Sequence, residues 1–207
     1  MLDLRAPALP VERGERLSRE AYRRDFRERE QAIRGGDSWK LERLQHFEEV
    51  GSPSREALRR GDWQEALRLM AGRADALRAE ALDDERRGAA FHRLRVVEEP
   101  LTPYLQWELH SLRQQAQFGH LVRVVPADVL APAESDTPLP ELVVLDDRTL
   151  YRVLYSPNGA PAGAMRWTDP SVVKPWASYI RGAYALGEDV LTYFDRVVAP
   201  LPPPPAA

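Results

Sequence analysis

The sequence predicts an α/β (α+β) fold in which one sheet is flanked by helices and preceded by a helical N-terminal extension. Three observations predict it. Charged residues gather at the N-terminal end, since residues 1–90 hold 19 basic and 19 acidic residues and residues 91–207 hold 10 and 13. Most β-branched and aromatic residues fall in the second part. That part also mixes strand-like and helix-like segments, as a mixed sheet requires.

The N-terminal part is predicted to be helical. A run of opposite charges over residues 18–33, followed by two glycines, predicts a charged helix with a thin apolar stripe. Such a stripe is typical of a solvated helix and also fits contact with a partner. Residues 39–50 place apolar side chains at helical spacing and predict a second helix. Residues 54–70 predict a short helix and then another with Asp62 as N-cap, and residues 73–85 continue as helix.

Residues 91–126 predict a β-α-β step. Strand-like alternation over residues 91–97 is followed by a helix over residues 104–118, which Gly119 ends as a C-cap. A further strand follows over residues 120–126 and ends at a proline. Parallel pairing of these two strands requires a right-handed crossover.

A hairpin and an aromatic helix complete the expected elements. Residues 142–145 and 149–155 predict two strands joined by the polar sequence Asp146-Asp147-Arg148. After Pro175, aromatic residues at helical spacing predict an amphipathic helix. Thr168 and Ser171 are the residues available to cap it.

The hairpin resembles a known active site. Residues 139–159, LPELVVLDDRTLYRVLYSPNG, have the outline of the active-site hairpin of the phospholipase D superfamily. They follow a helix, Gly119 and the strand LVRVVP, and they precede AMRWTDPSVV and the C-terminal helix. This order is similar to phospholipase-D-like sensor modules that accompany bacterial helix-turn-helix regulators. The resemblance implies a phospholipase-D-like sheet flanked by helices.

A second likeness concerns the chain as a whole. The segments WKLER at residues 39–43 and FHRLRVVEEPLTP at residues 91–103 resemble an uncharacterised actinobacterial family that contains a domain of unknown function. That family is often encoded beside helix-turn-helix regulators and small partner proteins. The resemblance covers residues 37–195. Its motifs are structural, so it transfers architecture better than function.

The catalytic residues of the phospholipase D motif are missing. The motif is His-x-Lys-x4-Asp, in which His is the nucleophile and Lys neutralises phosphate charge. Counting back from Asp146 places Leu139 and Glu141 at the His and Lys positions, and counting back from Asp147 places Pro140 and Leu142 there. No His-x-Lys occurs anywhere in the chain. The sequence therefore predicts the fold without the usual reaction.

The predicted organisation has four parts. These are a charged helical extension over residues 1–36, a helical subdomain over residues 37–90, a degenerate phospholipase-D-like α/β domain over residues 91–198, and a Pro-rich tail over residues 199–207.

Composition limits the function classes. The net charge of −3 and the pI near 5.9 lack the basic excess of nucleic-acid binders, so we expect no direct nucleic-acid binding. The chain has no cysteine and no apolar run long enough to span a bilayer, which fits a cytoplasmic protein without membrane contact. Three of its histidines lie close in sequence without the spacing of metal ligands. We therefore expect no metal and no cofactor.

Two groups of residues are candidate sites. Asp146, Asp147, Arg148 and Asn158 are ligand-binding candidates because α/β sheets place ligands at strand ends, although Asp-Asp-Arg is also a typical polar hairpin turn. The aromatic residues Trp176, Tyr179 and Tyr184 are partner-binding candidates, with core packing against the sheet as the other interpretation.

The resulting hypothesis is a non-catalytic accessory or ligand-sensing protein that partners a transcriptional regulator or belongs to a conflict-type gene pair. One alternative is a hydrolase or transferase that uses Asp146, Asp147 and Glu141. Another is a toxin-antitoxin-type interaction protein. Because phospholipase D sites need two half-motifs and this chain has one, a homodimer would complete the architecture.

Overall fold

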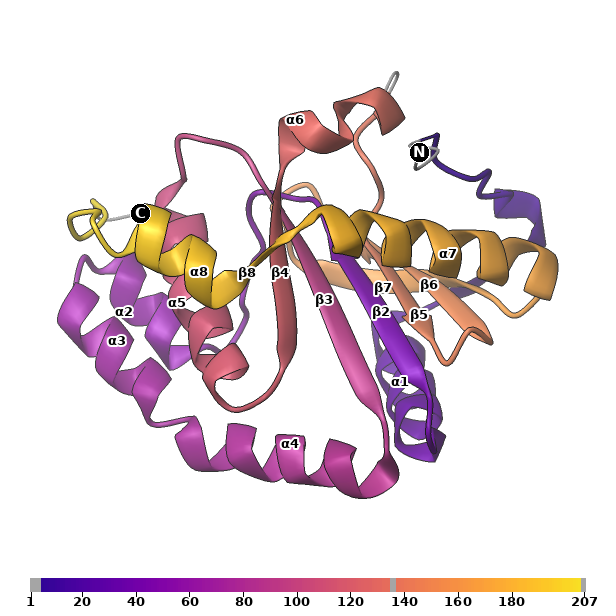
Figure 1. Ribbon diagram of the computed structural model, residues 1–207, viewed down its shortest axis with the longest axis horizontal. Helices are drawn as coiled ribbons and strands as arrows, with labels where there is room; N and C mark the ends of the chain where they lie inside the picture. The colour runs from indigo at the N-terminus through magenta and orange to yellow at the C-terminus, as the bar shows by residue number, and fades with distance from the viewer. Residues whose placement is uncertain (1–4, 135–136, 206–207) are drawn as a thin grey trace.

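The computed structural model describes residues 5–134 and 137–205. Within them, eight strands form one open sheet in the order β1-β7-β6-β5-β2-β3-β4-β8 (Figure 1). The strands are β1 Glu15–Leu17, β2 Asp37–Glu42, β3 Ala90–Val97, β4 Leu121–Pro126, β5 Leu142–Leu145, β6 Thr149–Tyr155, β7 Pro161–Trp167 and β8 Glu188–Asp189. Helices flank this sheet, so the predicted α/β fold class is confirmed.

The sheet has a parallel half and an antiparallel half. Strands β2, β3 and β4 are parallel, with Trp39 opposite His92 and Arg95 opposite Val124. Strands β5, β6 and β7 form an antiparallel meander, and β5 joins it to β2 in antiparallel register. The short strands β1 and β8 pair with β7 and β4 at the two edges. The parallel pairing of β3 with β4 through an intervening helix confirms the predicted β-α-β step.

The helices are α1 Arg19–Ala32, α2 Pro53–Arg59, α3 Trp63–Ala71, α4 Ala74–Arg87, α5 Pro103–Gln117, α6 Ala127–Leu130, α7 Pro170–Leu186 and α8 Val190–Tyr193, with short helical turns at Val11–Arg13, Ala131–Ala133 and Phe194–Val198. Side-chain caps begin α1 and α3, and the cap of α3 by Asp62 was predicted. The Ser18 hydroxyl accepts from the N–H of Ala21 at 3.2 Å, and the Asp62 carboxylate accepts from the N–H of Glu65 at 3.1 Å.

One face of the sheet is covered by α7. The apolar residues of β2 to β7 on this face pack with the buried face of α7 into the largest core cluster. An N-terminal arm extends this cover, because Trp167 Nε1 donates to the carbonyl of Pro10 at 2.8 Å and Trp176 Nε1 donates to the carbonyl of Ala8 at 3.2 Å. These two buried indole N–H groups thus find partners in the arm.

The opposite face is covered by two separate helices. Helix α1 packs on β5, β6 and β7 through a cluster that contains Tyr22, Phe26 and Tyr151. Helix α5 packs with α8 on β3 and β4 around Leu105, Leu109 and Val124. Helices α2 and α3 pack beside α5, and α4 runs along the lower side in Figure 1 from α3 to the start of β3. The middle strands of this face therefore lie between α1 and α5.

The prediction of a helix over residues 39–50 is wrong. Residues 37–42 form β2 at the centre of the sheet, and residues 43–52 are irregular. The spacing of Leu41, Leu44 and Phe47 imitates a helix, but Leu41 belongs to the core under α7 and Phe47 to the cluster of α2 and α3. Pairing of β2 with β3 and β5, which are distant in sequence, decides the outcome.

The sheet also crosses the predicted domain boundaries, because β1 comes from residues 1–36 and β2 from residues 37–90. Helix α7 begins before Pro175, and its N-cap is Asp169 in place of Thr168 or Ser171, since the Asp169 carboxylate accepts from the N–H of Ser171 at 2.8 Å. The described part of the Pro-rich tail contacts α5, where Gln106 Nε2 donates to the carbonyl of Pro202 at 2.8 Å. Residues 206–207 of that tail lie outside the described residues.

Replacing Gly163 by alanine is expected to lower the free energy of unfolding by about 2 kcal/mol. Gly163 has a φ of +128°, and an added Cβ would collide with the carbonyl oxygen of Leu17 on β1. Chemical unfolding followed by circular dichroism measures the loss. As a control, Gly72→Ala has no close backbone obstacle and should leave stability within about 0.5 kcal/mol. Equal effects of the two variants would contradict this account.

Candidate ligand-binding cleft

Charged side chains occupy the middle of the sheet face that α7 does not cover. Along β2, Trp39 and Leu41 point into the core under α7 while Lys40 and Glu42 point to the other face. Along β3, the same alternation places Arg93 and Arg95 beside them. Lys40, Glu42 and Arg93 lie between α1 and α5, and Arg95 is buried against Glu108 of α5. The middle of this face is therefore polar.

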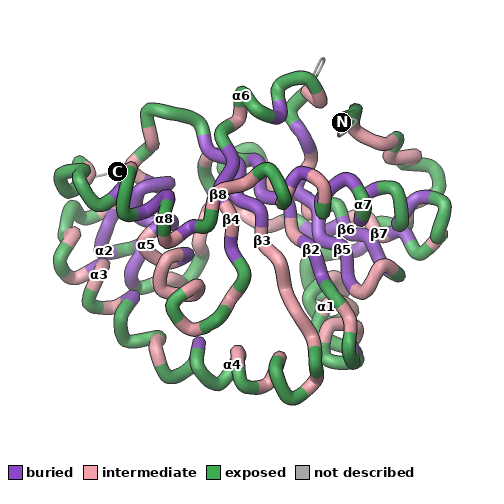
Figure 2. The backbone as a smooth tube through the Cα atoms, in the orientation of Figure 1, coloured by how far each residue is buried: buried purple, intermediate pink, exposed green. Residues whose placement is uncertain are grey.

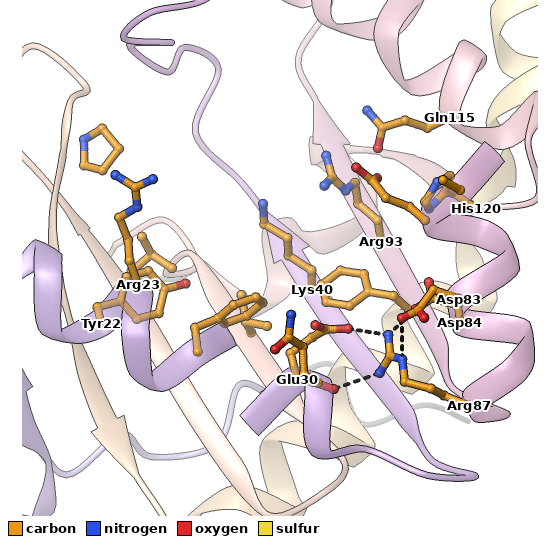
Figure 3. A pocket seen from close by; sticks show the side chains of 18 of the residues that line it. Tyr22, Arg23, Glu30, Lys40, Asp83, Asp84, Arg87, Arg93, Gln115 and His120 are labelled. Atoms are coloured by element: carbon orange, nitrogen blue, oxygen red, sulfur yellow. Dashed lines mark hydrogen bonds and ion pairs between the residues drawn. The ribbon is translucent and has the colours of Figure 1, made fainter. Parts of the chain in front are cut away.

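A cavity of about 930 Å³ opens over this region between α1 and α4. Its floor includes Lys40, Phe91 and Arg93, and Figure 3 shows Lys40 between Tyr22 and Arg23 of α1 on one side and Arg93 on the other. Further apolar lining comes from Phe26, Val143, Val153, Tyr155 and Pro161. We call this space the outer cavity. It combines cations at its floor with an apolar wall, as small-molecule sites commonly do.

A second cavity of about 540 Å³, which we call the inner cavity, lies next to the outer one. Lys40, Glu80, Arg93 and Gln115 line both. The inner cavity extends past Glu42 to the start of α2 and to α5, where its lining includes Ser52, Ser54, Arg73, Trp107, Glu108 and Ser111. The two cavities together form one cleft along the middle of the sheet.

Glu42 organises the charges of the cleft. The residue is 4% exposed, and its Oε1 lies 2.5 Å from Lys40 Nζ while its Oε2 lies 3.6 Å from Arg93 Nη1. Burial alone would raise the pKa of Glu42, but Arg93, Lys40 and Arg95 outweigh it and lower the pKa to about 2. Glu42 is therefore an anion at neutral pH and holds both cations at the floor of the cleft.

Arg95 and Glu108 form a buried ion pair beneath the inner cavity. Arg95 is fully buried, and its Nε lies 2.8 Å from Glu108 Oε2. Arg95 Nη1 also donates to the carbonyls of Glu42 and Val96 at 3.2 and 3.1 Å. Burial tends to lower the pKa of Arg95, but Glu108 and Glu42 outweigh it and raise that pKa. The pair fixes β3 to α5. Arg95 lines neither cavity, whereas Glu108 lines the inner one.

The two walls of the outer cavity are joined at one end. Arg87 of α4 pairs with Glu30 of α1 at 2.7 Å and donates to the Glu30 carbonyl at 2.9 Å. Arg87 also pairs with Asp83 and Asp84 at 2.9 and 2.5 Å. Figure 3 shows this group at the edge of the cavity, away from Arg23. It links α1 to α4 beside the space that a ligand would fill.

The predicted ligand residues Asp146 and Asp147 form the turn between β5 and β6. Both have positive φ, +49° and +50°, and Arg148 N donates to the carbonyl of Leu145 at 3.0 Å, which defines a type I′ turn. Asp147 pairs with Arg181 of α7 at 3.2 Å, and Arg148 lies 3.3 Å from Asp146 with its side chain 83% exposed. These residues line neither cavity of the cleft, and their ligand-binding role stays a prediction.

Replacing Asp147 by glycine is expected to raise the free energy of unfolding by about 0.5–1 kcal/mol, because glycine adopts positive φ without the steric cost that aspartate carries. The surface pair with Arg181 that is lost contributes less than this. Thermal unfolding measures the change. Arg148→Gly, at a position without positive φ, is the control and should not stabilise. A destabilised Asp147→Gly variant would contradict the turn account.

Asn158 lies in the turn between β6 and β7, away from Asp146. Its side-chain oxygen accepts from the Ser156 hydroxyl at 2.5 Å, and Gly159 follows with positive φ. The structure therefore does not bring the four predicted ligand residues into one pocket.

The predicted partner residues are mostly in the core. Trp176 and Tyr179 are 2% and 6% exposed and pack against the sheet, which is the core-packing interpretation of this stripe. Tyr184 is half-buried, and its ring lies edge-on to Trp39 and His92 with Arg123 over its face. Tyr184 is the member of the group that keeps surface for a partner.

Glu141 links the start of β5 to the chain that follows β2. Its Oε1 accepts from the N–H groups of Arg43 and Leu44 at 2.7 and 2.6 Å. Burial, and then repulsion from Glu42, raises the pKa of Glu141 to about 7. Glu141 lines neither cavity, so its geometry supports a role in holding the chain together.

Sequence reasoning missed the residues at the centre of the cleft. The predicted helix over residues 39–50 contains Lys40 and Glu42, and the predicted strand over residues 91–97 contains Arg93 and Arg95. A signal was present, because the alternation of charged and apolar residues in FHRLRVV predicts a strand with two arginines on one face. What the sequence could not show is that the neighbouring strand carries Lys40 and Glu42 on that face.

Neither a metal cluster nor a membrane helix is found where the structure describes the chain. In residues 5–134 and 137–205, no three His, Asp or Glu side chains gather to hold a metal ion. No helix in the same ranges is long and apolar enough to cross a membrane.

Comparisons with known proteins give a family. A domain of unknown function, DUF6879, matches residues 24–195. Neither the curated proteins nor the solved structures contain a match to the chain. The matched range includes β2 to α8 and most of α1, so it contains the charged floor of the cleft, while Tyr22 and Arg23 of the outer cavity precede it.

Proposed function

The chain belongs to the DUF6879 family, and we propose that it is a ligand-sensing protein whose cleft binds the acid group of a small organic molecule. One observation carries the proposal. Lys40 and Arg93 lie side by side on the floor of an open cavity of about 930 Å³ that also has an apolar wall. A carboxylate or phosphate on these cations would leave the rest of the molecule against that wall.

The exposure of the cations supports this role. The side chains of Lys40 and Arg93 are 22% and 24% exposed, so they are held by Glu42 and still reach the cavity. Arg95 lies two residues after Arg93 on β3. It is fully buried and forms an ion pair with Glu108. Lys40 and Arg93, each about a quarter exposed, are thus prepared for a ligand, because their side chains are already ordered.

The position of the cleft supports sensing. Its walls, α1 and α4, come from different parts of the chain, and α4 is exposed along most of its length (Figure 2). A ligand that contacts both walls would favour one spacing between the two helices, and the exposed surface of α4 would present that change to a partner.

The partner is proposed from the sequence likeness. We propose that ligand binding changes how the chain contacts a helix-turn-helix transcriptional regulator or the other member of a conflict-type gene pair. Co-expression with the neighbouring gene product, followed by size-exclusion chromatography, tests the partner, and separate elution would overturn it.

The phospholipase-D-like origin of the fold is part of the same proposal, supported by the hairpin at residues 139–159 and the helix-Gly119-strand order.

Loss of ligand binding in a Lys40→Met variant is the expected result that tests the cleft. A panel of organic acids and amines is screened by thermal shift against the purified protein. We expect the stabilising compounds to carry an acid group and the shift to fall by more than half in Lys40→Met. Lys174→Met is the matched control, since Lys174 is the chain's other lysine and lies exposed on α7. A shift that survives in Lys40→Met would overturn the proposal.

A further inference from the structure

The two cavities of the cleft meet where opposite charges alternate. Lys40, Arg93 and Glu80 line both cavities, and Glu42 lines the inner one. Two cations therefore stand beside two carboxylates at this junction. A site for a simple anion would not need the carboxylates within reach of the ligand, whereas a molecule with charges of both signs would use all four groups.

Glu42 has unused capacity to accept a hydrogen bond. The residue is 4% exposed, and its Oε2 makes no hydrogen bond within the described residues. The Arg93 guanidinium stands 3.6 Å from that oxygen, beyond hydrogen-bond distance. Because a buried carboxylate oxygen is costly to leave unpaired, a donor on a ligand in the inner cavity would satisfy it.

The cations have unused donors. A lysine ammonium carries three donors and an arginine guanidinium five. In the described part of the chain, the ion contacts of Lys40 and Arg93 are those with Glu42. Most of their N–H groups therefore remain for an acid group in the outer cavity, beside the acceptor that Glu42 offers.

Glu80 completes the charge balance at the junction. It lies on α4 with an exposed side chain and lines both cavities, and no ion pair of Glu80 occurs among residues 5–134 and 137–205. With Glu42 it balances Lys40 and Arg93. The junction is thus neutral overall and locally polar, which suits a ligand head that is itself neutral overall and doubly charged.

We propose that the cleft binds a free α-amino acid with an apolar side chain, an inference that rests on the proposed function above. The carboxylate binds Lys40 and Arg93, and the ammonium binds Glu42 Oε2 and Glu80. The side chain lies in the outer cavity against its apolar lining, which includes Tyr22, Phe26, Phe91, Val143 and Val153.

The spacing of the charges favours this class of ligand. Lys40 Nζ and Glu42 Oε1 are 2.5 Å apart, so the cation and the anion of the site are adjacent. An α-amino acid carries its ammonium and carboxylate on one carbon, and both can therefore reach the junction together. A molecule with widely separated charges could engage the cations or Glu42 and would leave the other unpaired.

Isothermal titration calorimetry of the full chain with three probes tests the inference. L-Phenylalanine carries both charged groups, 3-phenylpropionate lacks the ammonium, and 2-phenylethylamine lacks the carboxylate. L-Phenylalanine is expected to bind at least about 10-fold more tightly than either of the others, the factor that one charged hydrogen bond contributes.

Two variants assign the effect to the junction. In Glu42→Gln the preference for L-phenylalanine over 3-phenylpropionate should fall by about 10-fold. Glu80→Gln, an exposed change that leaves the buried charges intact, should reduce the same preference if Glu42→Gln does not fold. Lys174→Met should bind all three probes as the unmodified chain does.

The outcomes separate the two proposals. Equal binding of 3-phenylpropionate and L-phenylalanine, or no change in their ratio in either glutamate variant, would overturn the amino-acid inference and leave the acid-binding cleft standing. Preferential binding of 2-phenylethylamine would overturn both. Absence of L-phenylalanine binding would overturn the amino-acid inference, while the acid screen still decides the cleft.

Discussion

Replacing Arg95 by alanine is expected to lower the free energy of unfolding by about 3–5 kcal/mol, because the variant leaves Glu108 buried without its cation. Arg95 is fully buried, and Glu108 is 6% exposed at the other end of a 2.8 Å ion pair. The substitution also removes the donors to the carbonyls of Glu42 and Val96. Urea unfolding followed by circular dichroism at pH 7 measures the loss.

A double variant separates the pair from its surroundings. Arg95→Met with Glu108→Leu removes both charges and keeps most of the volume, so it should recover the larger part of the lost stability. Arg78→Ala is the matched control, because Arg78 pairs with Asp75 on the exposed surface of α4 and should change stability by less than about 0.5 kcal/mol. If the double variant loses as much free energy of unfolding as the two single variants lose together, the two residues are not coupled.

The same buried pair explains how a polar sheet face is tolerated. A sheet normally buries apolar residues on a face that helices cover. Here the middle of one face carries Lys40, Glu42, Arg93 and Arg95, and each has an opposite charge within 4 Å. Since buried charges require partners, the network allows the cleft to exist without unpaired ions beneath it.

Local sequence signals predicted much of the fold. The strands over residues 142–145 and 149–155 have the predicted bounds, and Asp62 caps α3 as predicted. These features depend on neighbours in sequence: alternation of side chains in a strand, or a side-chain oxygen next to free N–H groups at a helix start. They need no knowledge of the rest of the chain.

The missed elements depend on distant contacts. Strand β2 carries a helix-like spacing of Leu41, Leu44 and Phe47, and only its pairing with β3 and β5 makes it a strand. Strand β7 contains Pro161 and Gly163, which are poor strand formers, and pairs with β6 and β1. The cleft could not be predicted from the sequence for the same reason. Its charged floor forms only when β2 pairs with β3.

The turn of the hairpin at residues 139–159 lies away from the cleft, whereas its strands line the outer cavity. The turn at Asp146 and Asp147 contacts Arg181 of α7, on the face opposite the cleft. Strands β5 and β6 themselves contribute Val143, Val153 and Tyr155 to the outer cavity. The segment that resembles a degenerate active site therefore supplies apolar wall to the proposed ligand site, while the charges come from β2 and β3.

The stability of the chain is expected to fall by about 3 kcal/mol as the pH rises from about 4.5 to 7, through Glu141 alone. Burial and repulsion from Glu42 raise the pKa of Glu141 from 4.5 to about 7 in the folded chain. Between these values the folded state holds a proton that the unfolded state has released, so raising the pH favours unfolding. Below pH 4.5 both states are protonated, and the stabilising contribution is fully present.

The geometry at Glu141 agrees with a bound proton. Oε1 accepts from the N–H groups of Arg43 and Leu44, whereas Oε2 is buried without a hydrogen-bond partner in the described residues. Glutamine can keep Oε1 as the acceptor and carries no charge at any pH. Glu141→Gln should therefore remove the loss of stability between pH 4.5 and 7.

Urea unfolding of the unmodified chain and of Glu141→Gln, measured at intervals between pH 4 and 8, tests this expectation. Glu42 affects stability in a lower pH range. Its pKa is lowered to about 2, so its contribution to the free energy of unfolding is lost as the pH falls from 4.5 toward 2. Glu20→Gln, an exposed change on α1, is the control and should keep the slope of the unmodified chain. If Glu141→Gln keeps that slope as well, the proton released on unfolding belongs to another group, and Glu141 is ionised where it holds β5 to the end of β2.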